Sequence, residues 1–149
     1  MDRLFVAENT KARERLNSLV GRLTDDELSL PVGDDWTIAI ALAHLAFWDR
    51  RSLLLLRKWE KSGIVEPSPI DIDITNDSLL ATWRALSPRT AADLAVSSAE
   101  EIDRELERIS SDLIAKIESL GETSRLYRAI HRKMHLDQIE AVLSDKTPT

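Results

Sequence analysis

The chain of 149 residues contains no cysteine. It therefore has no disulfide bond, no thiolate metal ligand and no cysteine nucleophile, a composition that suits the reducing cytoplasm. An excess of positive charge is also missing, because 20 Lys and Arg stand against 26 Asp and Glu and the net charge is -6. A negative chain repels phosphate backbones, so we expect no nucleic-acid partner. The lack of cysteine leads us to expect a cytoplasmic protein.

Long apolar runs are lacking as well. None approaches the roughly 18 residues that a membrane helix needs, and the start, MDRLFVAENTKARER, lacks the pattern of a signal peptide, so we expect no membrane partner. The sequence contains no glycine-rich phosphate loop, no G-x-S-x-G and no H-E-x-x-H motif. Hydrophobic residues make up 43% and charged residues 31%, which is typical of one globular domain, expected over residues 1–149.

Glycine and proline are scarce, with four and five residues, and they separate stretches of helical pattern. Apolar residues recur at steps of three and four in the long stretches, and no useful β alternation is present. The connection 63–76 is longer than the two to eight residues usual between bundle helices. The sequence predicts an all-α fold, a four-helix bundle with one long crossover connection, with helices over about 2–23, 38–62, 77–86, 88–120 and 123–143.

The second predicted helix has two unusual features. Its four consecutive leucines, Leu53 to Leu56, are wider than one apolar stripe needs. The helix is therefore either buried on two sides or in contact with another subunit, which makes a homodimer one expectation. The helix is also locally basic, and an anionic cofactor or the surrounding carboxylates would neutralise that charge; the basic residues are Arg50, Arg51, Arg57, Lys58 and Lys61.

The chain has three histidines: His44, His131 and His135. The last two are four residues apart, and on a helix this spacing lets both imidazoles reach one metal ion. His44 lies one turn from Ala41 and Trp48, beside the apolar stripe of its helix, so all three rings point toward the core or its edge. A buried histidine needs partners for both ring nitrogens, and either separate polar groups or one shared ion would provide them.

Three segments of the chain resemble one family. Residues 35–37 (DWT) leading into 43–49 (AHLAFWD) resemble the entry to the metal-bearing helix of the DinB-like proteins, a superfamily of helical bundles that includes YfiT-type proteins and mycothiol-dependent maleylpyruvate isomerases. Residues 130–139 (IHRKMHLDQI) resemble the last helix of that family, with its H-x3-H-x2-Q-I pattern. Asp73-x2-Asn76 and Trp83-Arg84 resemble its middle region, so the similarity extends over nearly the whole chain.

The resemblance implies an up-down-down-up bundle that holds a divalent metal ion through His44, His131 and His135. Zinc or nickel suits imidazole best, and three ligands leave a coordination position open, as in catalytic sites. Members of this superfamily use low-molecular-weight thiols or metal-bound water. The resemblance therefore implies a thiol-dependent S-transferase or isomerase, or a hydrolase, with a small-molecule substrate. Since the chain has no cysteine, the thiol would be an external cofactor such as mycothiol or bacillithiol.

Five further side chains are candidates for the pocket or for supporting the ligands. They follow or precede the histidines at helical spacing, or belong to the aromatic residues that could wall a cavity: Trp48, Ser52, Trp83, Tyr127 and Gln138. Each also has an ordinary role, as a core aromatic or as a helix residue bonded to solvent or a neighbouring loop. Asp73 and Asn76 either close over the site or cap the helix that follows, and we favour capping.

A different class of function is also compatible with the sequence. The histidines would then hold an ion for stability only, in a non-catalytic metal-binding helical module, such as a dimeric stress-response or binding protein. A fold and a metal do not define a reaction, so the sequence leaves both classes open and identifies no catalytic residue beyond the proposed ligands.

Overall fold

A computed structural model describes residues 3–146 of the chain as an all-helical protein. Its only strands within this range are β1 and β2, which pair antiparallel through Pro31 with Thr37 and Val32 with Trp36. The elements are α1 (Leu4–Arg22), α2 (Asp25–Leu28), β1 (Pro31–Val32), β2 (Trp36–Thr37), α3 (Ile38–Ser62), α4 (Ile72–Ala85), α5 (Pro88–Arg108), α6 (Ser111–Leu120), the 3-10 turn η1 (Thr123–Arg125) and α7 (Ala129–Lys146).

The prediction of one unbroken helix over 88–120 is wrong. Ile109 leaves the helix with an extended backbone, and Ser110 starts α6 by accepting a hydrogen bond from the Leu113 amide through its side chain. Serine is a strong N-cap residue because its oxygen satisfies an amide that has no partner in the first turn. The apolar stripe keeps its register across the break, since Ile109 and Leu113 are both buried. Periodicity alone therefore could not reveal it.

Two other helix starts differ from their predictions. The crossover helix α4 begins at Ile72, five residues before the predicted start, because Asp71 caps it through the Ile74 amide. The last helix begins at Ala129, after η1, rather than at 123 or 124. This helix extends through Lys146, three residues beyond its predicted end at about 143.

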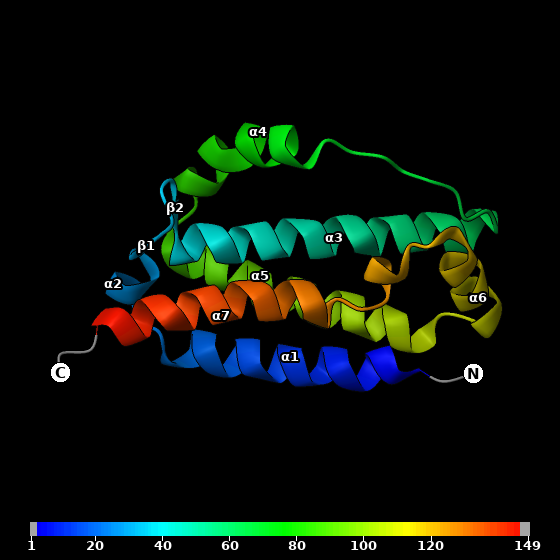
Figure 1. The fold of residues 1–149 in the computed structure, drawn as a ribbon, viewed down its shortest axis with the longest axis horizontal. Helices are drawn as coiled ribbons and strands as arrows, with labels where there is room; N and C mark the ends of the chain where they lie inside the picture. Colours follow the sequence, from blue (N-terminus) through cyan, green and yellow to red (C-terminus); the bar gives the residue numbers. More distant parts are fainter. Residues whose placement is uncertain (1–2, 147–149) are drawn as a thin grey trace.

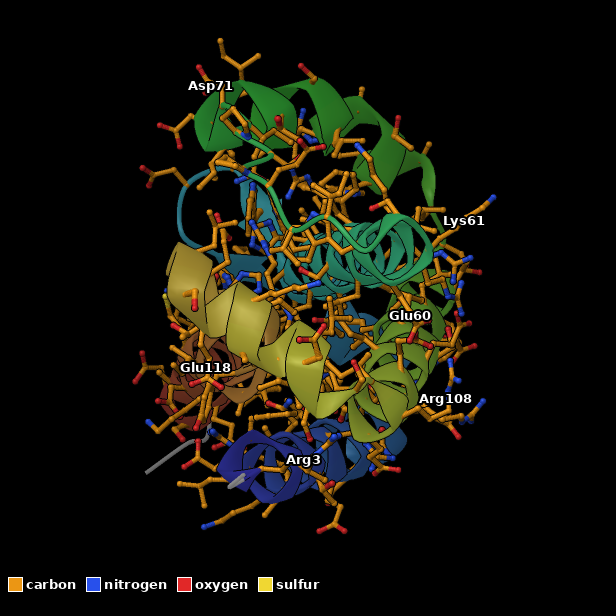
Figure 2. The ribbon with its side chains drawn as sticks, turned by 90° about the vertical axis from the view of Figure 1, so that its right-hand side faces the viewer. Arg3, Glu60, Lys61, Asp71, Arg108 and Glu118 are labelled. Carbon is orange, nitrogen blue, oxygen red and sulfur yellow. The ribbon has the colours of Figure 1, made fainter. Side chains whose placement is uncertain are left out.

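The four long helices lie side by side, α1 and α7 running in one direction and α3 and α5 in the other (Figure 1). Helix α5 packs against α3 and α1, and α7 packs against α1 and α3. The segment after Gly63 returns along the outside of α3 and leads into α4. Among the long helices, α4 packs mainly against α3. From the α6 end, the labelled side chains of Lys61 and Arg108 lie at the periphery (Figure 2).

The core consists of two apolar clusters separated by polar residues. One cluster surrounds the start of α3 and the end of α7, and the other surrounds the end of α3, α5 and α6. Between them each long helix contributes at least one buried polar side chain: Asn9, Asp49, Asp103 and Arg132. This arrangement places a charged layer across the middle of the protein, beside the three histidines.

The run of four leucines divides between core and surface. Leu53 and Leu56 are fully buried, whereas Leu54 is about half exposed. Packing in the apolar cluster at the end of α3 thus accounts for Leu53 and Leu56. Within residues 3–146 no helix is both long and apolar enough to cross a lipid bilayer.

Candidate metal centre

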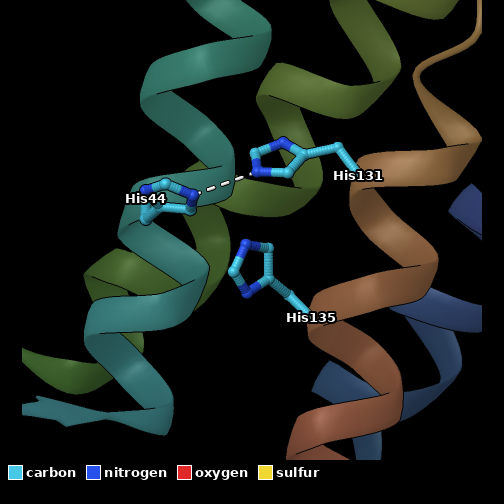
Figure 3. Close-up of side chains that lie close together, drawn as sticks. All are labelled: His44, His131 and His135. Carbon is cyan, nitrogen blue, oxygen red and sulfur yellow. Dashed lines mark hydrogen bonds between the residues drawn. The ribbon is translucent and has the colours of Figure 1, made fainter. Parts of the chain in front are cut away.

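The three histidine rings meet between α3 and α7 (Figure 3). His44 comes from α3, and His131 and His135 come from successive turns of α7. The ring centroids are 4.9 Å apart for His44 and His131, 4.7 Å for His44 and His135, and 4.8 Å for His131 and His135. One nitrogen from each ring lies within 4.8 Å of the other two, a grouping that is able to hold a metal ion.

Local sequence determines where these rings lie. Thr37 caps α3 by accepting from the Ile40 amide at 3.1 Å, which sets the start of the helix two turns before His44. Small buried residues, Ala41 and Ala43, surround that turn. On α7 the four-residue spacing places His131 and His135 one above the other. His44 and His135 are buried and His131 is half-buried.

An amide from α4 determines the tautomer of His44. The Asn76 side-chain oxygen accepts from Trp48 Nε1 at 3.0 Å and lies 3.2 Å from His44 Nδ1. An indole nitrogen is a donor only, so the group that it meets is the amide oxygen. His44 Nδ1 must therefore carry its proton, and neutral His44 directs an Nε2 lone pair at His131 Nε2, 3.0 Å away.

The second amide contact involves His135. Its Nδ1 lies 3.1 Å from the Gln138 side-chain oxygen, which accepts a hydrogen bond when Nδ1 carries the proton. Its Nε2 is buried and has no hydrogen-bond partner among residues 3–146. A buried acceptor without a partner costs free energy, and a metal ion would satisfy it.

The electrostatic environment keeps the rings neutral. Burial, with a contribution from His135, lowers the pKa of His44 to about 4. Burial and the neighbouring His135 and Arg128 lower the pKa of His131 to about 2, and burial also lowers that of His135. All three imidazoles are therefore uncharged near pH 7, which is the form that binds metal ions.

The histidines line a cavity of about 530 Å³. Its apolar wall consists of two indoles and three aliphatic side chains: Trp36, Trp48, Ile70, Ile72 and Met134. Its polar residues besides the histidines are Asn76, Ser124, Arg125 and Arg128. A cavity with apolar walls and few convergent polar groups is typical of sites for small molecules.

The five side chains predicted to support the site lie in different places. Trp48 lines the cavity, and the side chain of Gln138 contacts His135. Trp83 is buried with its ring centroid 5.7 Å from that of His44, and Ser52 reaches the cavity only through a hydrogen bond from Arg125. Tyr127 precedes α7 and packs edge-on against Phe5 in the other core cluster, so it is not part of the cavity wall.

The interpretation of Asp73 and Asn76 as helix caps is wrong. Asp71 is the cap of α4, Asp73 is exposed in its first turn, and Asn76 lies inside the helix, directed at His44. Residue statistics could not distinguish an asparagine that caps a helix from one that orients a histidine. The resemblance of this segment to the family's middle region was the better signal.

Several cavity residues were not predicted from the sequence, among them Trp36, Arg125 and Arg128. The Trp36 ring centroid is 4.7 Å from that of His44. Arg128 lies three residues before His131, a spacing that would have pointed to the same side of a helix. The helix starts only at Ala129, however, and the position of Arg125 follows from η1, which the sequence did not predict.

Comparison with known proteins gives one match. The sequence model described as the DinB superfamily matches residues 8–139, from α1 to α7, and the match includes all three histidines. Neither the curated proteins nor the solved structures compared with the chain gave a match. The family match covers most of the chain and agrees with the helical fold and the buried group of three histidines. This chain belongs to the DinB superfamily.

Proposed function

We propose that this protein is a metal-dependent enzyme in which His44, His131 and His135 hold one divalent ion, zinc or nickel. The observation that carries the proposal is the convergence of one nitrogen from each ring within 4.8 Å. Neutral imidazoles and the unpartnered Nε2 of His135 suit such an ion, because a nitrogen lone pair is the donor that these metals prefer.

The residues around the triad would hold the ligands in place. Asn76 and Gln138 would accept hydrogen bonds from the Nδ1 atoms of His44 and His135 and so leave Nε2 unprotonated, with its lone pair available to a metal ion, on both rings. Groups that orient ligands in this way usually affect metal affinity as well as geometry. When bound, an ion with three protein ligands supplies Lewis acidity and an open position for an external thiol or for water.

We propose the reaction class from the family and from the composition of the chain. An external low-molecular-weight thiol would be the nucleophile in an S-transferase or isomerase, and water would be the nucleophile in a hydrolase. The absence of cysteine supports an external thiol, and the 530 Å³ cavity supports a small-molecule substrate. The absence of cysteine also supports a location in the reducing cytoplasm.

The arrangement of the helices supports a four-helix bundle made by one domain. In this description the long crossover is the segment from Gly63 through α4, which joins α3 to the parallel helix α5. A homodimer stays a prediction, with Leu54 as the part of the leucine run left exposed for a contact. Sedimentation equilibrium of the purified protein tests it.

Metal analysis tests the proposal for the ion. Protein purified without a histidine tag should contain close to one zinc or nickel ion per chain, and His131→Ala should lose it, because two remaining ligands rarely retain an ion. Stoichiometric metal in that variant would contradict the three-histidine site.

A thiol screen separates the enzyme from a non-catalytic metal-binding module. A thiol that binds the folded protein raises its melting temperature by mass action. We expect a shift with mycothiol, bacillithiol or glutathione in metal-loaded protein and none in His131→Ala. A loaded protein that responds to no thiol would contradict the thiol-dependent reaction and favour a hydrolase or a binding module.

A further inference from the structure

Two arginines line the same cavity as the histidines, although the chain as a whole is acidic. Arg128 is 5% exposed and Arg125 is 16% exposed at their side chains. Arg128 directly precedes α7, three residues before His131, and Arg125 ends η1. Because both arginines and the triad line one cavity of about 530 Å³, a small molecule in that cavity is able to contact both groups.

Neither guanidinium uses all of its donors within the described residues 3–146. Arg128 donates to Asp49 at 2.8 Å through Nε and to the Ser124 carbonyl at 3.0 Å through Nη1. Arg125 donates to Ser52 at 3.2 Å through Nη1, and its Nε, though 3.3 Å from Glu122, has no hydrogen bond in the described part of the chain. Each arginine therefore keeps an Nη2 group without a hydrogen bond in residues 3–146. Arg125 Nε is in addition buried, and a buried donor without a partner is unfavourable.

The positive charge here is only partly neutralised. Asp49 is shared between Arg128 and Arg132. Arg51, whose guanidinium carbon is 6.0 Å from the Trp48 ring centroid, donates through Nη2 to Ser68. Within residues 3–146 it has no carboxylate partner, and its buried Nη1 has no hydrogen bond. Burial, together with Arg128 and Arg51, lowers the pKa of Arg125. The neutral histidines contribute no negative charge, so this end of the cavity is suited to an anion.

We propose that Arg125 and Arg128 form a carboxylate-binding subsite, and that the ligand of this cavity is a small molecule with an apolar body and a carboxylate. The planar guanidinium matches a carboxylate, which can accept from both free Nη2 groups. The apolar lining of the same cavity, which includes Trp48, Ile72 and Met134, suits an apolar body. That this ligand is the substrate or the thiol rests on the proposed function, whereas the subsite does not.

The test compares 3-phenylpropionate with its neutral amide, 3-phenylpropanamide, on the full chain. Binding is followed by the fluorescence of the cavity tryptophans and by NMR. Hydrogen bonds to charged groups account for about tenfold or more in affinity, so the carboxylate should bind at least about tenfold more tightly than the amide. Arg125→Gln should remove most of this preference, and Arg125→Lys should keep part of it.

The matched control is Arg104→Gln, since Arg104 also pairs with a glutamate close in sequence, Glu100, but is exposed on α5. It should leave the preference unchanged, and circular dichroism and NMR spectra should confirm that all variants are folded. Equal binding of acid and amide, or an unchanged preference in Arg125→Gln, would overturn the proposal.

Measuring the protein both as purified and after EDTA treatment separates this proposal from the metal site. A preference that persists in both states, and is lost in Arg125→Gln, supports the subsite even if no metal is found. A preference that needs the ion and survives Arg125→Gln would instead assign the carboxylate to the metal and overturn the subsite.

Discussion

Arg132 is expected to be one of the largest single contributors to the stability of the fold. The side chain is fully buried in the layer between the two apolar clusters. It donates to both Asp103 oxygens at 2.8 and 2.9 Å, to Asp49 at 3.3 Å and to the Asn9 carbonyl at 3.1 Å. The guanidinium thus joins α1, α3, α5 and α7 at one point.

Replacing Arg132 with methionine keeps most of the volume but removes the charge. Among the ion pairs of residues 3–146, Asp103 then retains only the one with Arg13, and Asp49 only the one with Arg128. Breaking a buried ion pair by removing one partner costs about 3–5 kcal/mol. A domain of this size has about 5–15 kcal/mol in total, and 1 kcal/mol corresponds to roughly 2–4 °C in melting temperature. We therefore expect the variant to melt about 6–20 °C lower.

Urea unfolding in EDTA, followed by circular dichroism, measures this loss without a contribution from metal binding. The double variant Arg132→Met/Asp103→Leu should recover part of the loss, because it no longer buries a partly unpaired carboxylate. Arg104→Ala, which removes an exposed ion pair to Glu100, should change the stability by less than about 1 kcal/mol. A loss below about 1 kcal/mol in Arg132→Met would refute the view that the charged layer holds the helices together.

Three further predictions concern the histidines. In metal-free protein the pKa values of His44 and His131 are lowered, so below the ordinary histidine pKa of about 6.5 the unfolded chain binds more protons than the folded one. The free energy of unfolding should therefore fall as the pH drops from 6.5 toward 4, by up to about 1.4 kcal/mol per pH unit per histidine. Urea titrations at pH 7 and 5 measure this fall, which His44→Gln should reduce, and an unchanged stability would contradict buried neutral rings. Asn76→Ala should weaken metal binding about 10–100-fold, measured by competition with a chelator. The control Asn17→Ala, at an exposed residue, should leave the affinity unchanged. Equal affinities of the Asn76→Ala and wild-type proteins would show that Asn76 does not support the metal site. Adding zinc to metal-free protein at about 100 times its dissociation constant should stabilise the fold by about 2.7 kcal/mol in a thermal or urea melt, with no effect in His131→Ala.

The long helices could be predicted because each carries enough apolar residues at helical spacing to identify a buried face. The break at Ile109 could not, since Ile109 and Leu113 continue the stripe on either side of it. The same limit applies to α4, whose start depends on which of several acidic residues acts as the cap, and the structure selects Asp71.

The site divides in a similar way. The three histidines could be identified because the residue type is rare in this chain and two of them share a metal-binding spacing. The charged layer could not, because arginine and aspartate are ordinarily exposed, and only the three-dimensional pairing of Arg132 with Asp49 and Asp103 explains their burial. Likewise the contact of Asn76 with His44 joins residues 32 positions apart, beyond any local pattern.

X-ray absorption spectroscopy of the bound metal tests the central claim most directly. For zinc bound by His44, His131 and His135, the spectrum should show three imidazole nitrogens at about 2.0–2.1 Å, and fewer in a His135→Ala variant. A spectrum of the wild-type protein with only oxygen ligands, and no imidazole scattering, would contradict the account.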